Sequence, residues 1–195
     1  MGGSILPVSL HNGQIYFLFG KERDIDENPG WSDFGGGTEP GETFIQTAIR
    51  EGAEELTGFL GNSSNIKLLL DKYGTYNIDY KNNGRTTYRC HIFPMKYDHL
   101  LIHYYNNNQQ FLQQRLDANI IKDTKIFEKT QIKWFSLDDM KTNRNEFRSF
   151  YQNIVDLIIN DSSKINRFVK SKLLKHKNSD TKKKRKSSKR RENHY

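Results

Sequence analysis

Three glutamates in one short segment are the residues of this sequence best suited to chemistry. Glu51 precedes Glu54 and Glu55 by three and four residues, so on a helix all three share one arc. Like charges at this spacing repel one another, at a cost of roughly 0.2–0.5 kcal/mol per pair. A divalent cation would offset that repulsion, and oxygen-only ligands favour Mg²⁺ or Mn²⁺. An exposed acidic helix face, with Arg50 paired to Glu54, would show the same residues without a metal.

The segment before these glutamates favours the cation site. Gly35-Gly36-Gly37 allows backbone groups to approach a phosphate or a metal closely. After Pro40-Gly41, residues 43–56 have helical periodicity, with Glu42-Thr43 as a cap. The apolar arc of this expected helix adjoins the carboxylate arc without overlapping it, and consists of Ile45, Ala48, Ile49, Gly52 and Leu56.

The run Gly36-x5-Glu42-x7-Arg50-Glu51-x2-Glu54-Glu55 resembles the signature of the Nudix hydrolases, and the resemblance extends over most of residues 1–140. It implies an α+β fold, an α/β/α sandwich around a mixed sheet, and a Mg²⁺-dependent enzyme that cleaves phosphoanhydride bonds. Gly52 stands where the family usually has a bulky aliphatic residue. Gly52 costs about 1 kcal/mol of helix propensity relative to alanine, and it would allow the helix to pack closer to the sheet. A second departure is one extra residue before Gly58, which leaves the carboxylate spacing intact.

The resemblance also implies roles for individual residues. The expected metal ligands are Glu51, Glu54, Glu55 and the carbonyl of Gly35. Arg50 would orient a carboxylate, while Gly36 and Glu42 would support the loop. Glu128 lies six residues before Trp134 and is the candidate for a fourth acid; an ordinary loop glutamate is the alternative. Either Glu51 or Glu128 would accept the proton of an attacking water. The catalytic set expected in this way is Glu51, Glu55, Arg50 and Glu128.

The positive charge of the chain lies at its C-terminal end. Of 31 Lys and Arg and 23 Asp and Glu, 11 and two lie in residues 172–195, which leaves 20 and 21 for residues 1–171. The globular part is therefore almost neutral. Residues 176–195 lack the apolar side chains needed to offset their ordering entropy, so we expect a disordered tail. Such basic runs bind RNA or other polyanions, act as nuclear import signals, or only solubilise the chain; the candidate contacts are Lys182, Lys183, Lys184, Arg185, Lys186, Lys189, Arg190 and Arg191.

Hydrophobic periodicity and turn-forming residues predict the remaining helices and strands. Strands are expected at 4–10 and 14–21, joined by a turn at Asn12-Gly13, and at 31–34, 66–70, 75–80, 86–97 and 132–137. Residues 106–119 form a weak helix or a loop insert, a short helical turn begins at Leu137, and helices are expected at 146–160 and 162–175. The predicted organisation is a catalytic domain at 1–160 with a C-terminal helix, a helical extension at 161–175 and the basic tail at 176–195.

Composition excludes other classes. A single cysteine, Cys90, forbids an internal disulfide, and the six histidines show no zinc-ligand spacing. The sequence shows neither a secretion signal nor an apolar run long enough to span a membrane. We therefore expect an intracellular protein, cytoplasmic or nuclear.

Three functions remain open. The first is hydrolysis of a nucleotide or nucleoside-diphosphate derivative. The second is removal of an RNA 5′ cap, with the basic tail holding the RNA, although the chain starts almost at its first strand and leaves no room for an N-terminal domain of the kind that cap-removing relatives often carry. The third is a catalytically inactive module that binds nucleotides or RNA.

Overall fold

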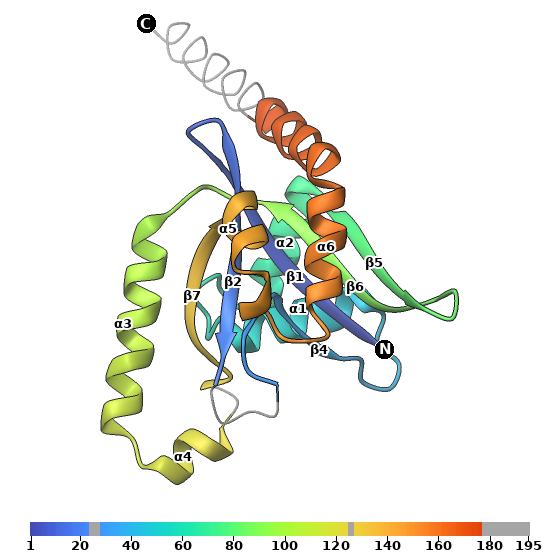
Figure 1. The fold of residues 1–195 in the computed structure, drawn as a ribbon. Helices are drawn as coiled ribbons and strands as arrows, with labels where there is room; N and C mark the ends of the chain where they lie inside the picture. Colours follow the sequence, from blue (N-terminus) through green and yellow to red (C-terminus); the bar gives the residue numbers. More distant parts are fainter. Residues whose placement is uncertain (24–27, 125–126, 177–195) are drawn as a thin grey trace, which may run out of the picture.

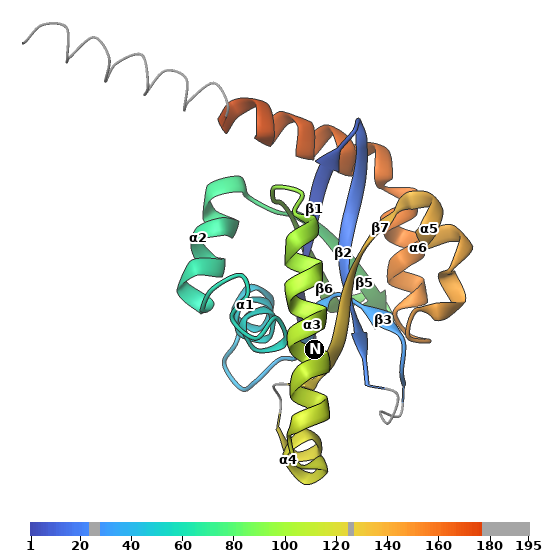
Figure 2. The same ribbon diagram turned by 90° about the vertical axis from the view of Figure 1, so that its left-hand side faces the viewer.

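The computed structural model describes residues 1–23, 28–124 and 127–176. Within them a seven-stranded sheet lies between two layers of helices (Figures 1 and 2). The strands are β1 (Gly2–His11), β2 (Gln14–Glu22), β3 (Trp31–Ser32), β4 (Phe34–Gly37), β5 (Tyr76–Asn82), β6 (Arg85–Pro94) and β7 (Lys129–Ser136). The helices are α1 (Phe44–Glu55), α2 (Ser63–Tyr73), α3 (His99–Arg115), α4 (Ala118–Asp123), α5 (Leu137–Thr142) and α6 (Gln152–Asn160), with a short 3₁₀ helix at Arg144–Glu146. Residues 162–176 are also helical.

The sheet is mixed. Its strands follow the order β3-β2-β1-β6-β5, while β4 also pairs with β1 and β7 also pairs with β2. The β1–β6 pair is parallel and the other pairs are antiparallel. The predicted α+β sandwich with a mixed sheet is therefore confirmed. The predicted hairpin turn is also present, since Asn12 and Gly13 both have positive φ angles, 49° and 81°, as a type I′ turn requires.

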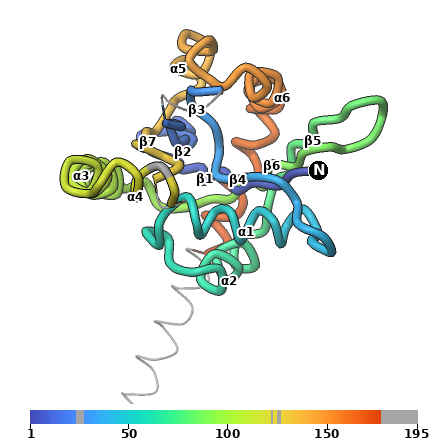
Figure 3. The backbone as a smooth tube through the Cα atoms, turned by 90° about the horizontal axis from the view of Figure 1, so that it is seen from below, coloured from blue at the N-terminus to red at the C-terminus, as the bar shows by residue number. Residues whose placement is uncertain are grey.

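Alternating side chains divide the core between the two faces of the sheet. Phe17 and Phe19 of β2 join a cluster with Tyr151 and Ile154, which cover one face through α6 and the segment before it. Leu18 points the other way and joins a cluster with Ala48 of α1. Viewed from below, α5 and α6 lie on one side of the strands and α1 and α2 on the other, with α3 and α4 at one edge (Figure 3).

The sheet divides at β1 and β2, and this division positions the site. The last residues of β1, from Val8 to His11, pair with β2, but its first residues, from Gly2 to Ile5, pair with β4. On its other edge β2 pairs with β7 from Tyr16 to Glu22. Helix α1 packs on β1 and β4. In its C-terminal half, Glu51 lies against Gly36 of β4 and Glu55 lies beside Lys129, the first residue of β7.

The strand predicted at 66–70 is wrong, because these residues belong to α2. Asn62 caps the helix: its side chain accepts a hydrogen bond from the backbone N–H of Asn65, and the Asn65 side chain accepts one from the backbone N–H of Asn62, both at 3.1 Å. Ile66 and Leu70 are buried, four residues apart on one helix face. The periodicity of a short apolar run does not distinguish a strand from a helix. Here the reciprocal asparagine cap favours the helix.

Two other boundaries also differ. The helix expected at 146–160 begins only at Gln152, because Phe147 forms a bridge with Trp31 of β3 and the N–H of Arg148 donates to the carbonyl of Trp31. Most of the weak helix or loop expected at 106–119 belongs to α3, which ends at Arg115, and its last two residues begin α4. Helix α3 starts at His99, where Asp98 accepts hydrogen bonds from the N–H groups of Leu100 and Leu101. Asn106 then exchanges two hydrogen bonds with the backbone of Ile132 in β7.

The C-terminal basic run is only partly visible. Of its basic residues, Lys172 and Lys175 lie on the described helical segment 162–176. The predicted RNA contacts from Lys182 to Arg191 lie outside the described residues. No helix of the described part of the chain is long and apolar enough to cross a lipid bilayer.

Gly52 allows the close helix packing that its unusual place in the motif predicted. A Cβ atom at this position would lie 2.4 Å from Cδ1 and 2.7 Å from Cγ1 of Ile5. Gly52→Ala should therefore lower the free energy of unfolding by about 1–2 kcal/mol, because the cost of overpacking exceeds the gain of about 1 kcal/mol in helix propensity. Thermal unfolding measures this change. Ile5→Val removes Cδ1, so adding it should make Gly52→Ala less costly; an equal cost in both backgrounds would contradict this explanation.

His91 should make stability depend on pH. The ring is buried, and neither ring nitrogen has a hydrogen-bond partner in the described part of the chain. Burial lowers the pKa of His91 from 6.5 to about 4, so between these values the unfolded chain binds a proton that the folded chain does not. The free energy of unfolding should fall by roughly 3 kcal/mol as the pH falls from 6.5 to 4. The free energy of unfolding of His91→Leu, measured by denaturant unfolding, should lack this pH-dependent decrease. If His91→Leu and the wild type showed parallel pH profiles, this explanation would be contradicted.

Candidate active site

The glycines of β4 bring the strand backbone against two glutamates of α1. Gly35 and Gly36 pair with Ser4 and Gly3 of β1. A Cβ atom at Gly36 would lie 2.6 Å from the Oε1 atom of Glu51, so only glycine leaves room for that carboxylate. The N–H of Gly35 donates a 2.8 Å hydrogen bond to Oε2 of Glu55. The helix therefore buries two carboxylates on the glycine strand as well as its apolar arc.

Arg50 joins the loop before α1 to the carboxylates. Its Nε and Nη2 atoms donate to the two oxygens of Glu42 at 2.9 and 3.0 Å, Nη2 also reaches the carbonyl of Gly37 at 3.1 Å, and Nη1 donates to Oε1 of Glu51 at 2.6 Å. The hydrogen bonds from Arg50 lower the pKa of Glu42 to about 2. Glu42 and Arg50 are thus both charged at neutral pH, and the guanidinium of Arg50 fixes the position of Glu51.

Glu55 lies in the most strongly charged part of the site. It is only 5% exposed, and Lys129 Nζ lies 3.3 Å from its Oε1 atom. Burial raises the pKa of Glu55 well above its ordinary value; Lys129 opposes this effect, and the negative charges of Glu22, Glu128 and Glu51 add to it. Glu128, the candidate fourth acid, therefore lies close enough to repel Glu55 electrostatically.

Glu54 is the most accessible of the three glutamates. Its side chain is 33% exposed and its Oε2 atom lies 3.9 Å from Nη1 of Arg50. It borders a shallow hollow of about 370 Å³, which is also lined by Arg50, Ala53 and Gly58. A ligand arriving from solvent would meet Glu54 before the two buried acids.

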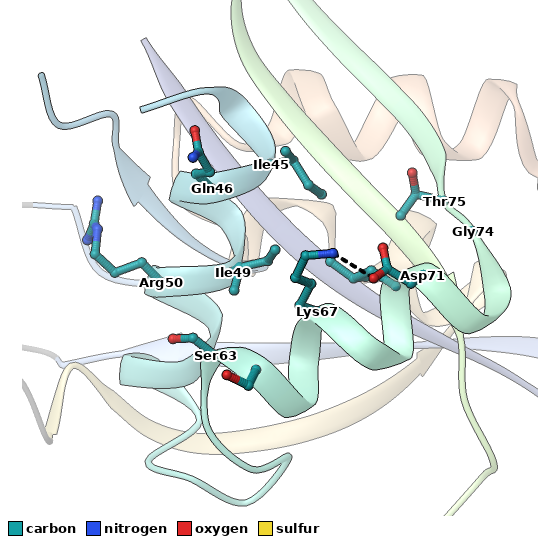
Figure 4. A pocket seen from close by; sticks show the side chains of 11 residues that line it. Ile45, Gln46, Ile49, Arg50, Ser63, Lys67, Asp71, Gly74 and Thr75 are labelled. Atoms are coloured by element: carbon teal, nitrogen blue, oxygen red, sulfur yellow. Dashed lines mark hydrogen bonds and ion pairs between the residues drawn. The ribbon is translucent and has the colours of Figure 1, made fainter. Parts of the chain in front are cut away.

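A larger hollow of about 600 Å³ lies between α1 and α2 (Figure 4). Arg50 lies at one side of this hollow, and Lys67 and Asp71, one turn apart on α2, form a 2.6 Å ion pair. Its lining includes Ile45 and Ile49 but none of the three glutamates. This hollow adjoins the acidic site without being part of it.

The acids are crowded, but they do not form a preformed cage. In the described residues, no group of three or more His, Cys, Asp or Glu side chains has the arrangement of a metal site. Arg50 holds Glu51, while Gly35 and Lys129 hold Glu55. The donor set nevertheless fits a hard divalent cation, because it consists of carboxylate oxygens that repel one another around Glu55.

Several residues of the site were not found from the sequence. Lys129, Glu22 and Ser32 form a buried polar group behind Glu55. Asp33, directly before the glycine strand, is buried and accepts hydrogen bonds from Ser4 and, at 2.7 Å, from Tyr88. One signal was available: an isolated glycine within a strand, here Gly20, indicates a close approach by another group.

A family model described as the NUDIX domain matches residues 4–157. The chain belongs to this family. The resemblance to the Nudix hydrolases that the glycine and glutamate spacing indicated is therefore confirmed. The enzyme class that this family represents is also confirmed: pyrophosphohydrolases acting on nucleotide anhydrides.

Solved Nudix structures share the fold at low sequence identity. One is an Ap4A hydrolase of C. elegans in a binary complex, 17% identical with a TM-score of 0.50, for which the match covers 85% of this chain and 98% of that one. Another is RenU, a Nudix hydrolase of M. smegmatis, 14% identical with a TM-score of 0.50 and coverage of 85% and 87%. No curated protein sequence matches the chain.

Proposed function

We propose that this Nudix protein hydrolyses a phosphoanhydride bond in a nucleotide or nucleoside-diphosphate derivative with the help of Mg²⁺ or Mn²⁺. The observation that carries the proposal is the burial of Glu51 and Glu55 against the backbone of Gly35 and Gly36. Burying two carboxylates on a helix that already carries a third is costly. Arg50 and Lys129 offset part of that cost, and a cation bound by the three carboxylates would offset more.

The residues divide into two groups by role. The carboxylates of Glu51, Glu54 and Glu55 and the carbonyl of Gly35 would hold the cation, which neutralises phosphate oxygens and lowers the pKa of a bound water. Arg50 keeps Glu51 oriented, and Glu42 with Gly36 supports the loop. Both assignments follow the hydrogen bonds of Arg50 and the room left by Gly36.

The reaction requires a group that removes a proton. The oxygen of a water molecule attacks one phosphorus, the bridging oxygen leaves with the electron pair of the P–O bond, and a carboxylate takes the proton of the water. Glu51 and Glu128 are the two candidates for this base. Both carry negative charge near Glu55, and a carboxylate placed beside the attacking water can accept its proton.

A substrate panel tests the proposal. The full chain with Mg²⁺ is given dinucleoside polyphosphates, nucleotide sugars, ADP-ribose, nucleoside triphosphates and capped RNA, and products are separated by chromatography. We expect turnover of at least one small nucleotide derivative, abolished by EDTA and restored by Mg²⁺. A protein that binds these ligands and yields no product from any of them would instead be the inactive binding module.

Cap removal from RNA is the second candidate, favoured by the 11 basic residues in positions 172–195. Deleting residues 177–195 keeps His176, which contacts the carbonyl of Lys72, and removes most of that charge. If RNA is the substrate, deletion should weaken decapping and reduce the steep salt dependence of RNA binding. Hydrolysis of a small nucleotide should not change. Equal RNA binding by the truncated protein would remove the tail from the function.

A further inference from the structure

Lys129, the first residue of β7, is a fully buried lysine. Its ammonium group contacts three acceptors: Glu22, the hydroxyl of Ser32 at 2.8 Å, and Oε1 of Glu55 at 3.3 Å. An ammonium group has three N–H donors; Lys129 donates hydrogen bonds to Glu22 and Ser32, and its contact with Glu55 is an ion pair. Three side chains therefore hold the ammonium group of Lys129 in place, and Glu55 is one of these three.

The fold makes room for this side chain. A Cβ atom at Gly20 of β2 would lie 2.8 Å from Cδ and 3.0 Å from Cγ of Lys129, so the lysine stem crosses the strand where a side chain is absent. The hydroxyl of Tyr105 bridges the backbone carbonyls of Glu55 and Lys129, at 2.9 and 3.2 Å. Helix α3 thereby joins the end of α1 to the start of β7.

The charges of this group are balanced. Glu22 also accepts a 2.7 Å hydrogen bond from Arg148, so two cations face the two carboxylates of Glu22 and Glu55. A buried ion is tolerated when it is paired and hydrogen-bonded. This balance leaves Lys129 a fixed element of the site and not a mobile surface charge.

We propose that Lys129 is a positioning residue for the hydrolytic reaction, which fixes the carboxylate of Glu55 for cation binding. The ammonium group of Lys129 forms an ion pair with Oε1 of Glu55, and the N–H of Gly35 donates a hydrogen bond to Oε2. A carboxylate has about four lone-pair sites, so each oxygen keeps one that is free for a cation. Because this role concerns a proposed metal ligand, it rests on the proposed function.

The test must separate positioning from charge. Lys129→Met alone removes a cation and would attract a metal simply by leaving two negative charges. Lys129→Met combined with Glu22→Gln removes one charge of each sign and keeps the buried net charge. Lys133→Met is the matched control, since Lys133 is an exposed lysine of the same strand.

We expect the double variant to bind Mn²⁺ about 10- to 100-fold more weakly than the wild type, the range found when residues that hold a metal ligand are changed. Mn²⁺ titration by electron paramagnetic resonance measures this without substrate. The Mg²⁺ concentration for half-maximal turnover should rise by a similar factor, while substrate KM at saturating Mg²⁺ changes little. Lys133→Met should match the wild type in all three measurements.

An unchanged Mn²⁺ titration in the folded double variant would overturn the role of Lys129 and leave the hydrolase proposal intact. A wild-type protein that neither binds Mn²⁺ nor hydrolyses any substrate would overturn both. If the double variant does not fold, Gly20→Ala decides, because it keeps every charge and crowds the lysine stem. It should weaken Mn²⁺ binding at least several-fold, and unaltered binding would again contradict the positioning role.

Discussion

Glu54→Gln and Glu55→Gln should each lower turnover by about a thousandfold or more, equivalent to about 4 kcal/mol of transition-state stabilisation. The amide keeps the shape of the side chain and loses the charge that would bind the cation. Glu54 is the cleaner substitution, because its side chain is one-third exposed and its replacement should leave the fold unaffected. Steady-state hydrolysis of the best substrate of the panel, at saturating Mg²⁺, measures the effect.

Glu146→Gln provides the control for this pair, since Glu146 is an exposed glutamate next to Phe147, on the face of the sheet opposite α1. It should hydrolyse substrate at the wild-type rate. Near-normal turnover by a folded Glu54→Gln or Glu55→Gln protein would show that the metal ligands are assigned wrongly.

Arg50→Lys should lower turnover by about 10- to 100-fold while the protein stays folded. The guanidinium reaches Glu42 with two atoms, Glu51 with a third, and the carbonyl of Gly37 as well. An ammonium group has no planar fork and cannot make these contacts together. The loop before α1 and the carboxylate of Glu51 would then lose their common support, and misplacement of reacting groups costs rate.

Arg89→Lys is the matched control for this substitution. Arg89 makes the same forked contact with Asp79, at 2.6 and 2.8 Å, between β5 and β6, and neither residue contacts the proposed cation ligands in these hydrogen bonds. It should leave kcat unchanged. Equal activity of Arg50→Lys and the wild type would mean that Glu51 does not depend on Arg50.

The acidic motif was predictable because its geometry is local. Residues three and four apart on a helix are neighbours whatever surrounds them, so Glu51, Glu54 and Glu55 share one arc by spacing alone. The Asn12-Gly13 turn has the same local origin. The position of α2 was not predictable from its apolar run, because Ile66 and Leu70 fit a strand as well as a helix until the Asn62–Asn65 cap is recognised.

The sequence by itself determined the family and the residues of the acidic helix, because both follow from short-range spacing, and the family resemblance implied the mixed α+β architecture. Only the tertiary structure decided which carboxylates are buried and what neutralises them. Lys129 lies 107 residues from Glu22 along the chain, and their ion pair forms because β7 joins β2 beside the end of α1. This ion pair depends on the order of the strands and on the absence of a side chain at Gly20. Long-range packing of this kind leaves no regular period in a sequence.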